Sequence, residues 1–176
     1  MLYRLGEDGE FADSVPTGKD AGTYTVYYKV AGDGNHTDTE EVSITVTIDP
    51  MRIKGISNID PVTKPYDGTA DAPLDKSALR FYSETESNIV LPDDAFTITN
   101  ARFTRLQADN SYQDSPEAGE GKSLSFTLTL TSGNYVFIRN KQEYTTEDCD
   151  IATDDVKMFT ITKADIGMNG IIVKDV

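Results

Sequence analysis

Few residues in this chain could act as a nucleophile or as a general base. The sequence contains one histidine, His36, and one cysteine, Cys149. Nucleophilic catalysis needs a base within hydrogen-bond reach of the attacking Ser, Thr or Cys, whereas these two residues are widely separated along the chain. Cys149 is also flanked by Glu147, Asp148 and Asp150, and neighbouring negative charges oppose formation of the thiolate. We therefore expect no catalytic residues and no enzymatic activity.

Carboxylates are abundant, because the chain carries 30 Asp+Glu against 16 Lys+Arg, a formal net charge of −14. Paired carboxylates carry out glycoside hydrolysis, but with so many acids a plausible pair identifies nothing. Calcium prefers oxygen ligands, and two acidic loops offer them: Asp33, Asn35 and Asp38 in one, and Asp148, Asp150, Asp154 and Asp155 in the other. The first loop fails the EF-hand spacing, since position six is Asp38 instead of glycine. We favour solvated loops, with no metal and no cofactor.

The composition argues against other classes of function. A strongly acidic chain lacks the basic face that nucleic acids and anionic membrane surfaces require, and no apolar run approaches the ~20 residues that span a bilayer. A single cysteine forms no internal disulfide. Residues 1–6 show no basic region followed by a long apolar stretch, so no signal peptide is expected here. Either the protein is not exported or this segment belongs to something longer, and we expect a monomer without nucleic acid or membrane insertion.

Apolar and polar residues alternate along several stretches, which is the period of a β-strand with one buried face. Threonine is a frequent outward residue, and its β-branched side chain suits a pleated surface. The alternating stretches are 23–30, 42–48, 96–103, 124–130 and, less regularly, 158–162. Turn residues separate them, and the nearest approach to a helix is one short turn within 72–79. The sequence predicts an all-β fold of antiparallel sheets, and we favour a β-sandwich.

Two short segments resemble each other and divide the chain. Residues 48–53 (Ile-Asp-Pro-Met-Arg-Ile) and 161–166 (Ile-Thr-Lys-Ala-Asp-Ile) each follow a Thr-rich strand and lead into another apolar segment. We interpret them as junctions in a tandem array, although any Thr-rich strand before a Pro or Ala turn would look similar. On this interpretation residues 51–163 are one complete unit. Residues 1–48 end a preceding unit, and 164–176 are the first strand of a following unit or a tail.

The N-terminal segment carries a motif of a known family. It contains a proline at 16, an Ala-Gly-Thr-Tyr strand start at 21–24 and a Gly-Asp-x-Asn-His turn at 32–36. This pattern resembles the second half of an Ig-like repeat that occurs in tandem in large exported surface proteins of Gram-positive gut bacteria. The resemblance covers about residues 1–48, and it implies that Gly22 and Tyr24 are structural residues of that repeat.

A second motif resembles the YDG repeat of the same proteins. Residues 62–69 read Val-Thr-Lys-Pro-Tyr-Asp-Gly-Thr, and Gly-Asn-Tyr at 133–135 precedes a closing strand that ends in Ile-Thr-Lys. The resemblance spans about residues 53–163, and residues 106–122 are a polar insertion without a counterpart. It implies Ig-like sandwich units in tandem, with a β-grasp-like sheet as the alternative because alternation does not reveal strand order.

The residues of these motifs have structural interpretations. At Tyr66, Asp67 and Gly68 we expect a tight turn in which glycine takes a positive φ and aspartate bonds the backbone. The ring of Tyr66 would cover the core while its hydroxyl reaches a backbone carbonyl. Asn134 and Tyr135 would act similarly at the entrance to a strand.

The resemblance implies a non-catalytic stalk or spacer segment of an exported bacterial surface protein or adhesin, located outside the cell or attached to its wall. Its expected partners are neighbouring repeats of the same chain. One alternative is a module that binds a host glycan or protein through exposed Tyr82, Tyr112 and Tyr144, and another is an accessory domain of a secreted polysaccharide enzyme. Stalk domains of such bacteria also carry Lys–Asn isopeptide crosslinks, for which Lys54, Lys64 and Asn134 are candidates. No motif of that bond is matched.

Overall fold

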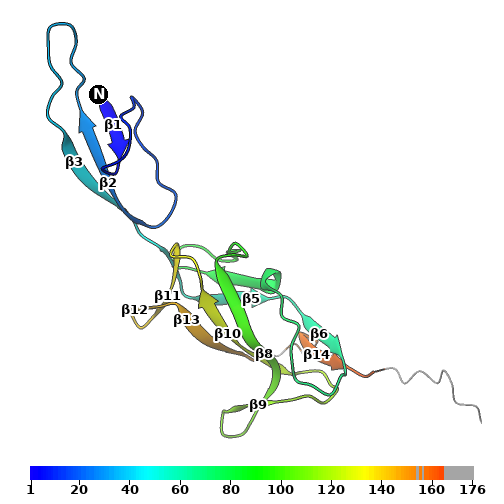
Figure 1. Ribbon diagram of the computed structural model, residues 1–176. Coiled ribbons are helices and arrows are strands. Elements are labelled where there is room, and N and C mark those ends of the chain that lie inside the picture. The colour runs from blue at the N-terminus through cyan, green and yellow to red at the C-terminus, as the bar shows by residue number, and fades with distance from the viewer. Residues whose placement is uncertain (154, 156, 165–176) are drawn as a thin grey trace, which may run out of the picture.

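The computed structural model describes residues 1–153, 155 and 157–164. The chain is all-β and sandwich-like, as the alternation predicts, with one short 3₁₀ helix, η1 (Lys76–Ala78), inside the stretch where a single helical turn was expected. Figure 1 shows two bodies of strands joined by a short connector, an N-terminal unit (residues 1–48) and a second unit (residues 51–163). Among the described residues, no helix is long and apolar enough to cross a membrane.

The N-terminal unit is a single antiparallel sheet of three strands, β1 (Leu2–Leu5), β2 (Gly22–Lys29) and β3 (Val42–Ile48), in the order β1-β2-β3. The predicted strands 23–30 and 42–48 correspond to β2 and β3. The register places Val26 of β2 opposite Leu5 on one side and Ile44 on the other. Alternate side chains of the three strands therefore share one apolar face.

The second unit contains four small sheets. Its strands are β4 (Met51–Ile53), β5 (Gly55–Ile59), β6 (Val62–Pro65), β7 (Leu79–Tyr82), β8 (Phe96–Leu106), β9 (Tyr112–Asp114), β10 (Ser123–Leu130), β11 (Tyr135–Arg139), β12 (Gln142–Tyr144), β13 (Thr146–Ile151) and β14 (Phe159–Thr162). The largest sheet has the order β13-β10-β8-β9, and the others are β12-β11-β4, β14-β6 and β5-β7. Most strand pairs are antiparallel as predicted, whereas two pairs, β11 with β4 and β14 with β6, are parallel.

A β-bulge interrupts the alternation of inward and outward side chains in β8, the longest strand. Phe96 and Phe103 are both buried although seven positions separate them, which a regular strand would place on opposite faces. The register against β10 shifts where Asn100, with φ of 56°, and Ala101 together face one residue of the partner. The extra residue returns the second half of the strand to the core face.

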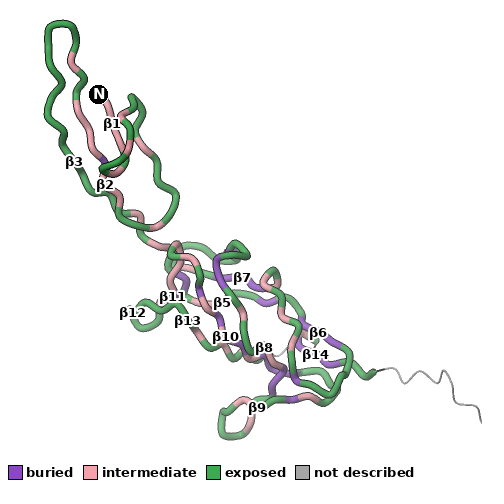
Figure 2. Tube along the Cα trace, viewed as in Figure 1, coloured by how far each residue is buried: buried purple, intermediate pink, exposed green. Residues whose placement is uncertain are grey.

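The core belongs almost entirely to the second unit. Figure 2 shows buried residues concentrated in its strands, whereas the N-terminal unit is mostly exposed or half-buried. The rings of Phe81 and Phe96 pack edge to face with centroids 5.4 Å apart. The residues buried in this core are Ile53, Ile59, Val62, Leu79, Phe81, Ile89, Leu91, Ala95, Phe96, Phe103, Leu124, Phe126, Leu128, Leu130, Phe137, Phe159 and Ile161. In the N-terminal unit only Val26 is buried.

The segment 106–122 contains the short strand β9, which pairs with the end of β8 and extends the largest sheet. The predicted strand or tail at 164–176 lies outside the described residues from 165 onward.

Candidate functional site

One asparagine connects the two units at their junction. Asn134 Oδ1 accepts a hydrogen bond from Ala21 N at 2.5 Å, and its Nδ2 donates to Asp20 Oδ1 at 2.9 Å. Its backbone oxygen accepts from Met51 N at 2.8 Å, at the start of β4. The side chain therefore binds the loop before β2 of the N-terminal unit, while the main chain binds the first residue of β4, which directly follows the connector.

The local sequence explains why Asn134 reaches this position. It ends the turn between β10 and β11, where its N–H donates to Ser132 Oγ at 3.3 Å. The next residue, Tyr135, pairs in parallel with Met51, so the turn lies directly beside the connector. That connector is only Asp49 and Pro50, because β3 ends at residue 48 and β4 begins at 51. Proline fixes φ and leaves the connector little freedom.

The partner loop is held by Tyr24, another residue of the sequence motifs. Tyr24 Oη donates to the backbone oxygen of Asp20 at 2.7 Å, and the carboxylate of Asp20 accepts from Asn134. Gly22, with φ of 155°, faces Ile48 at the end of the hairpin. Few L side chains adopt that φ, so glycine is required where the loop turns into β2. The structure thus joins Gly22, Tyr24 and Asn134, which come from two different motifs, into one junction.

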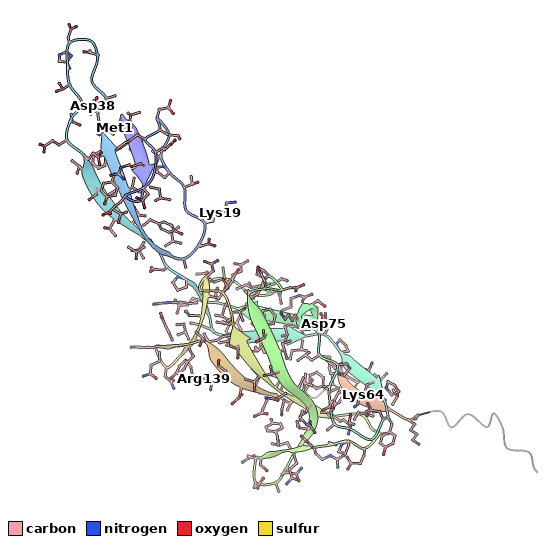
Figure 3. The ribbon with its side chains drawn as sticks, viewed as in Figure 1. Met1, Lys19, Asp38, Lys64, Asp75 and Arg139 are labelled. Atoms are coloured by element: carbon pink, nitrogen blue, oxygen red, sulfur yellow. The ribbon has the colours of Figure 1, made fainter. Side chains whose placement is uncertain are left out.

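The turn that contains Asp67 and Gly68 forms as the sequence predicts. Gly68 has φ of 83°, and Asp67 Oδ1 accepts from Thr69 N at 2.9 Å. Lys64 is buried and its Nζ donates to Asp67 Oδ1 and to Thr69 Oγ1, both at 2.8 Å. The hydrogen bond from Lys64, followed by those from Thr69, lowers the pKa of Asp67 to about 2. In Figure 3 the labelled Lys64 lies toward the end of the second unit far from the N-terminal sheet.

The expected packing of Tyr66 was wrong, because its side chain is 46% exposed. Val62 and Lys64 take the inward positions of β6, and strict alternation would make Tyr66 the next one. The strand ends at Pro65, however, and the chain turns outward after Tyr66 N donates to Thr162 O at 2.8 Å. Tyr135 is half-buried and packs against the core.

The single histidine and the single cysteine do not meet. His36 lies in the hairpin between β2 and β3, where its Nδ1 is 2.7 Å from Asp33 Oδ1. Cys149 is half-buried on β13 in the other unit. Burial, together with the negative charge of Glu147, raises the pKa of the Cys149 thiol to about 12. At neutral pH this thiol is protonated and is a weak nucleophile.

The acids of the first candidate calcium loop are engaged in turns. Asp33 Oδ1 accepts from Asn35 N at 2.8 Å, and Asp38 Oδ1 accepts from Gly32 N at 2.8 Å. Lys29 Nζ lies 2.8 Å from the other oxygen of Asp38. Hydrogen bonds from Asn35 N and His36 lower the pKa of Asp33, and those from Lys29 and Gly32 lower the pKa of Asp38. These bonds stabilise the hairpin itself.

The second acidic loop is partly a strand. Asp148 and Asp150 lie on β13 and accept hydrogen bonds from Thr127 at 2.7 Å and Ser125 at 2.5 Å. Asp154 lies outside the described residues. Across the described ranges, no group of three or more His, Cys, Asp or Glu side chains is arranged to hold a metal ion.

The remaining candidates are dispersed. Tyr82, Tyr112 and Tyr144 lie on β7, β9 and β12, in three different sheets. The isopeptide candidates are also apart, because Lys54 Nζ pairs with Glu84 at 2.8 Å and Lys64 with Asp67, whereas the Asn134 amide binds Asp20 and Ala21.

Sequence reasoning missed a buried lysine in the polar insertion. Lys122 is 3% exposed, and its Nζ donates to Ser115 O at 3.0 Å and to Ser115 Oγ at 2.8 Å. Burial lowers the pKa of Lys122. Nothing in the pattern marked this residue, because a lysine among polar neighbours is ordinarily solvated.

Comparison of the chain with protein-family models, with curated proteins and with solved structures found no match.

Proposed function

We propose that this chain is a non-catalytic spacer segment of an exported bacterial surface protein, which sets the distance and direction between the parts that flank it. The observation that carries the proposal is the junction. A two-residue connector joins the units, and Asn134 bonds across it to Asp20 and Ala21 while its backbone oxygen holds Met51, the residue that follows the connector. Inter-domain motion is the default for a small interface, so bonds that restrain a short connector favour a role that depends on stiffness.

The surface chemistry agrees with a spacer better than with a binding module or an enzyme. Tyr82, Tyr112 and Tyr144 lie in three different sheets, and His36 and Cys149 lie in different units. A formal net charge of −14 keeps an extended surface soluble and self-repelling. These features support a segment whose work is mechanical, with neighbouring repeats of the same chain as its partners.

Distance measurement between the units tests the proposal. Nitroxide labels at Thr37→Cys in the β2–β3 hairpin and at Glu86→Cys in the second unit would report the inter-unit distance distribution by double electron–electron resonance. Every sample carries Cys149→Ser, so that only the two introduced cysteines are labelled. Samples are diluted with unlabelled protein so that only distances within one molecule are recorded.

We expect one narrow distance distribution in the otherwise unaltered chain and a clearly broader one in Asn134→Ala. Asn58→Ala is the matched control, because Asn58 is exposed on β5 away from the junction. A broad distribution in the unaltered chain, or equal widths in Asn134→Ala and Asn58→Ala, would remove the basis for the spacer function.

A further inference from the structure

The third strand of the N-terminal sheet, β3, has a partner strand on only one of its two edges. The order β1-β2-β3 places it at the margin of the sheet, as Figure 1 shows. Within the described part of the chain, no backbone hydrogen bond or bridge from another segment is found on its outer edge. Such an edge presents unpaired N–H and C=O groups that can pair with another strand.

Other edge strands of the molecule carry features that discourage such pairing, namely charged residues and proline. β13 contains Glu147, Asp148 and Asp150, and β6 ends in Lys64 and Pro65. β3 is longer than either strand, with seven residues that read Val-Ser-Ile-Thr-Val-Thr-Ile. It contains no charge and no proline, and its register against β2 shows no bulge. Its outer edge is therefore suited to pairing.

Alternate residues of β3 direct their backbone groups to this open edge. Tyr3 of β1 exchanges both of its backbone hydrogen bonds with Ala12, so its N–H and C=O point away from β2. Direction alternates along and across antiparallel strands, so Tyr28, opposite Tyr3, points to β3, where Val42 is its partner. The residues of β3 that point outward are then the ones at the intervening positions: Ser43, Thr45 and Thr47.

The open edge also leaves apolar side chains uncovered on one flank. Val26 of β2 lies between Leu5 and Ile44 on the apolar face of the sheet and is 9% exposed. Ile44 has a neighbouring strand on one side only and is 50% exposed, as is Val42, and Val46 is 43% exposed. A strand added beside β3 would cover this flank, and the removal of apolar area from water favours such pairing.

We propose that β3 pairs edge to edge with β3 of a second copy of this chain, antiparallel and centred on Thr45. In this register Thr45 faces its own counterpart, and the other outward-directed residues, Ser43 and Thr47, face each other, so every outward N–H and C=O finds a partner. Apolar side chains also face apolar ones on the same side of the joint sheet: Val42 opposite Ile48, and Ile44 opposite Val46. A shift by one residue would set apolar side chains opposite polar ones.

The charges of the pairing segments lie at the two ends of the joint ladder. There Glu41 of one copy faces Asp49 of the other, outside the seven paired residues. Arg4 Nη2, which lies 2.7 Å from Glu41 Oε2, offsets part of this repulsion. Each molecule also carries a net charge of −14, and salt screens the repulsion between like charges. Association therefore strengthens as ionic strength rises.

The association closes at a dimer, because a two-fold contact uses the same edge of both molecules. The joint sheet then ends at β1 on each side, where Tyr3 is already bonded to Ala12 at 2.7 and 2.8 Å. Since β3 leads through the two-residue connector into the second unit, antiparallel pairing places the two second units at opposite ends of the joint sheet. This departs from the monomer that we expect from the sequence, and it does not depend on the spacer function.

Charge substitution at the self-facing position tests the proposal by sedimentation velocity on the full chain. Thr45→Lys alone and Thr45→Glu alone each set like charges opposite each other. Each variant should therefore dimerise about three- to tenfold more weakly than the unaltered chain. An equimolar mixture sets lysine opposite glutamate and should form a 1:1 dimer at least as well as the unaltered chain. Recovery on mixing also shows that neither variant is unfolded.

The matched control places the same charges on the neighbouring strand. Thr23 is exposed on β2, one strand away from the open edge. Thr23→Lys and Thr23→Glu should each dimerise as the unaltered chain does, and their mixture should show no gain. A gain on mixing that is equal at positions 23 and 45 would reflect general charge attraction and would contradict the register centred on Thr45.

Thr45→Pro tests the backbone contact separately. The N–H of Thr45 lies at the open edge, so its loss removes no bond between β2 and β3, and proline is tolerated on such an edge. In the dimer each Thr45 donates to the other, so this one substitution removes both central hydrogen bonds. Dimerisation should be at least about tenfold weaker than in Thr45→Ala, which retains the N–H. Circular dichroism of both variants checks that the sheet is intact.

Three further results would overturn the proposal. The first is a chain that stays monomeric at high salt and high concentration. The second is a mixture of Thr45→Lys and Thr45→Glu that forms no dimer. The third is a folded Thr45→Pro that dimerises as well as Thr45→Ala, which would place the contact away from the edge of β3. None of these results changes the inter-unit distance measured within one molecule, so the spacer function is tested separately.

Discussion

The two units use the same alternating sequence pattern with opposite results for burial. In β10 of the second unit, Leu124, Phe126 and Leu128 are between 0% and 3% exposed. In β3 of the N-terminal unit, the residues in the same pattern are between 43% and 50% exposed: Val42, Ile44 and Val46. Alternation therefore establishes which side chains share a face, and a second layer of structure decides whether that face is buried.

The difference in burial follows from how much structure packs over the apolar face in each unit. In the second unit, residues from β5, β6, β7 and β14 join those of β8 and β10 in one core. In the N-terminal unit, only residues 15–18 lie over the apolar face. Since hydrophobic stabilisation scales with apolar area removed from water, the second unit should provide most of the stability of the molecule.

The largest expected effect is in the core of the second unit. Phe81→Ala removes a ring that is 1% exposed and packs edge to face on Phe96. The loss of buried area together with the cavity left behind should destabilise this unit by about 3–5 kcal/mol. Native-state hydrogen exchange with peptide-resolved mass spectrometry would show faster exchange across β7, β8 and β10. Unchanged exchange there would mean that Phe81 is not part of a tightly packed core.

A smaller effect is expected at the one buried residue of the N-terminal sheet. Val26→Ala removes two methyl groups from a side chain that is 9% exposed, which should cost about 1–2 kcal/mol. The same exchange measurement should locate the change in β1, β2 and β3 alone. A loss of protection that extends into the second unit would show that the two units unfold together and would contradict the comparison.

Much of the fold follows from local pattern. The strand predicted at 42–48 is β3, and that at 124–130 is β10 with one residue added at its start. The parallel pairing of β6 with β14 could not be predicted, because the paired residues Lys64 and Ile161 are far apart in the sequence and either orientation satisfies the alternation. The bulge at Asn100 was also hidden, since Phe96 and Phe103 fall on opposite faces of a regular strand.

The junction was predictable only in part. Turn chemistry identified Asn134 as structural, and the Ala-Gly-Thr-Tyr motif identified Gly22 and Tyr24. The partner of Asn134, however, is Asp20, which lies 114 residues earlier. No local pattern links two polar residues at that distance, because their contact depends on how one folded unit is placed against the other.

Acid should destabilise the second unit through the carboxyl group of Asp67. In the second unit the pKa of Asp67 is lowered from 3.8 to about 2 by Lys64 and Thr69. A carboxyl whose folded pKa is lowered contributes stability above its unfolded pKa, and this stability is lost as the pH falls through the folded value. The contribution of Asp67 is therefore complete above about pH 4 and disappears toward pH 2.

Urea unfolding followed by circular dichroism between pH 5 and pH 2 checks this expectation. Asp67→Asn should lower the stability of the second unit at pH 5 and flatten its pH dependence in that window. Asp8→Asn, at an exposed position of the N-terminal unit, is the control and should leave the second unit unchanged. An Asp67→Asn chain that retains the full acid dependence would assign it to other carboxyls.

The smallest expected effect is that of Ile44→Thr. It sharpens the comparison most, because the same substitution can be made at an isoleucine in similar sequence on the last strand of each unit. Ile44 in β3 is flanked by Ser43 and Thr45, and Ile161 in β14 is flanked by Thr160 and Thr162. Ile44 is 50% exposed and Ile161 is 1% exposed.

Ile44→Thr should change the free energy of unfolding of the N-terminal sheet by no more than about 0.5 kcal/mol at a concentration where the chain is monomeric. Ile161→Thr buries a hydroxyl and removes apolar contact, so hydrogen exchange should report a loss of about 2–4 kcal/mol in the second unit. Equal costs at the two positions would mean that the apolar face of the N-terminal sheet is covered within one molecule, which would contradict the contrast between the two units.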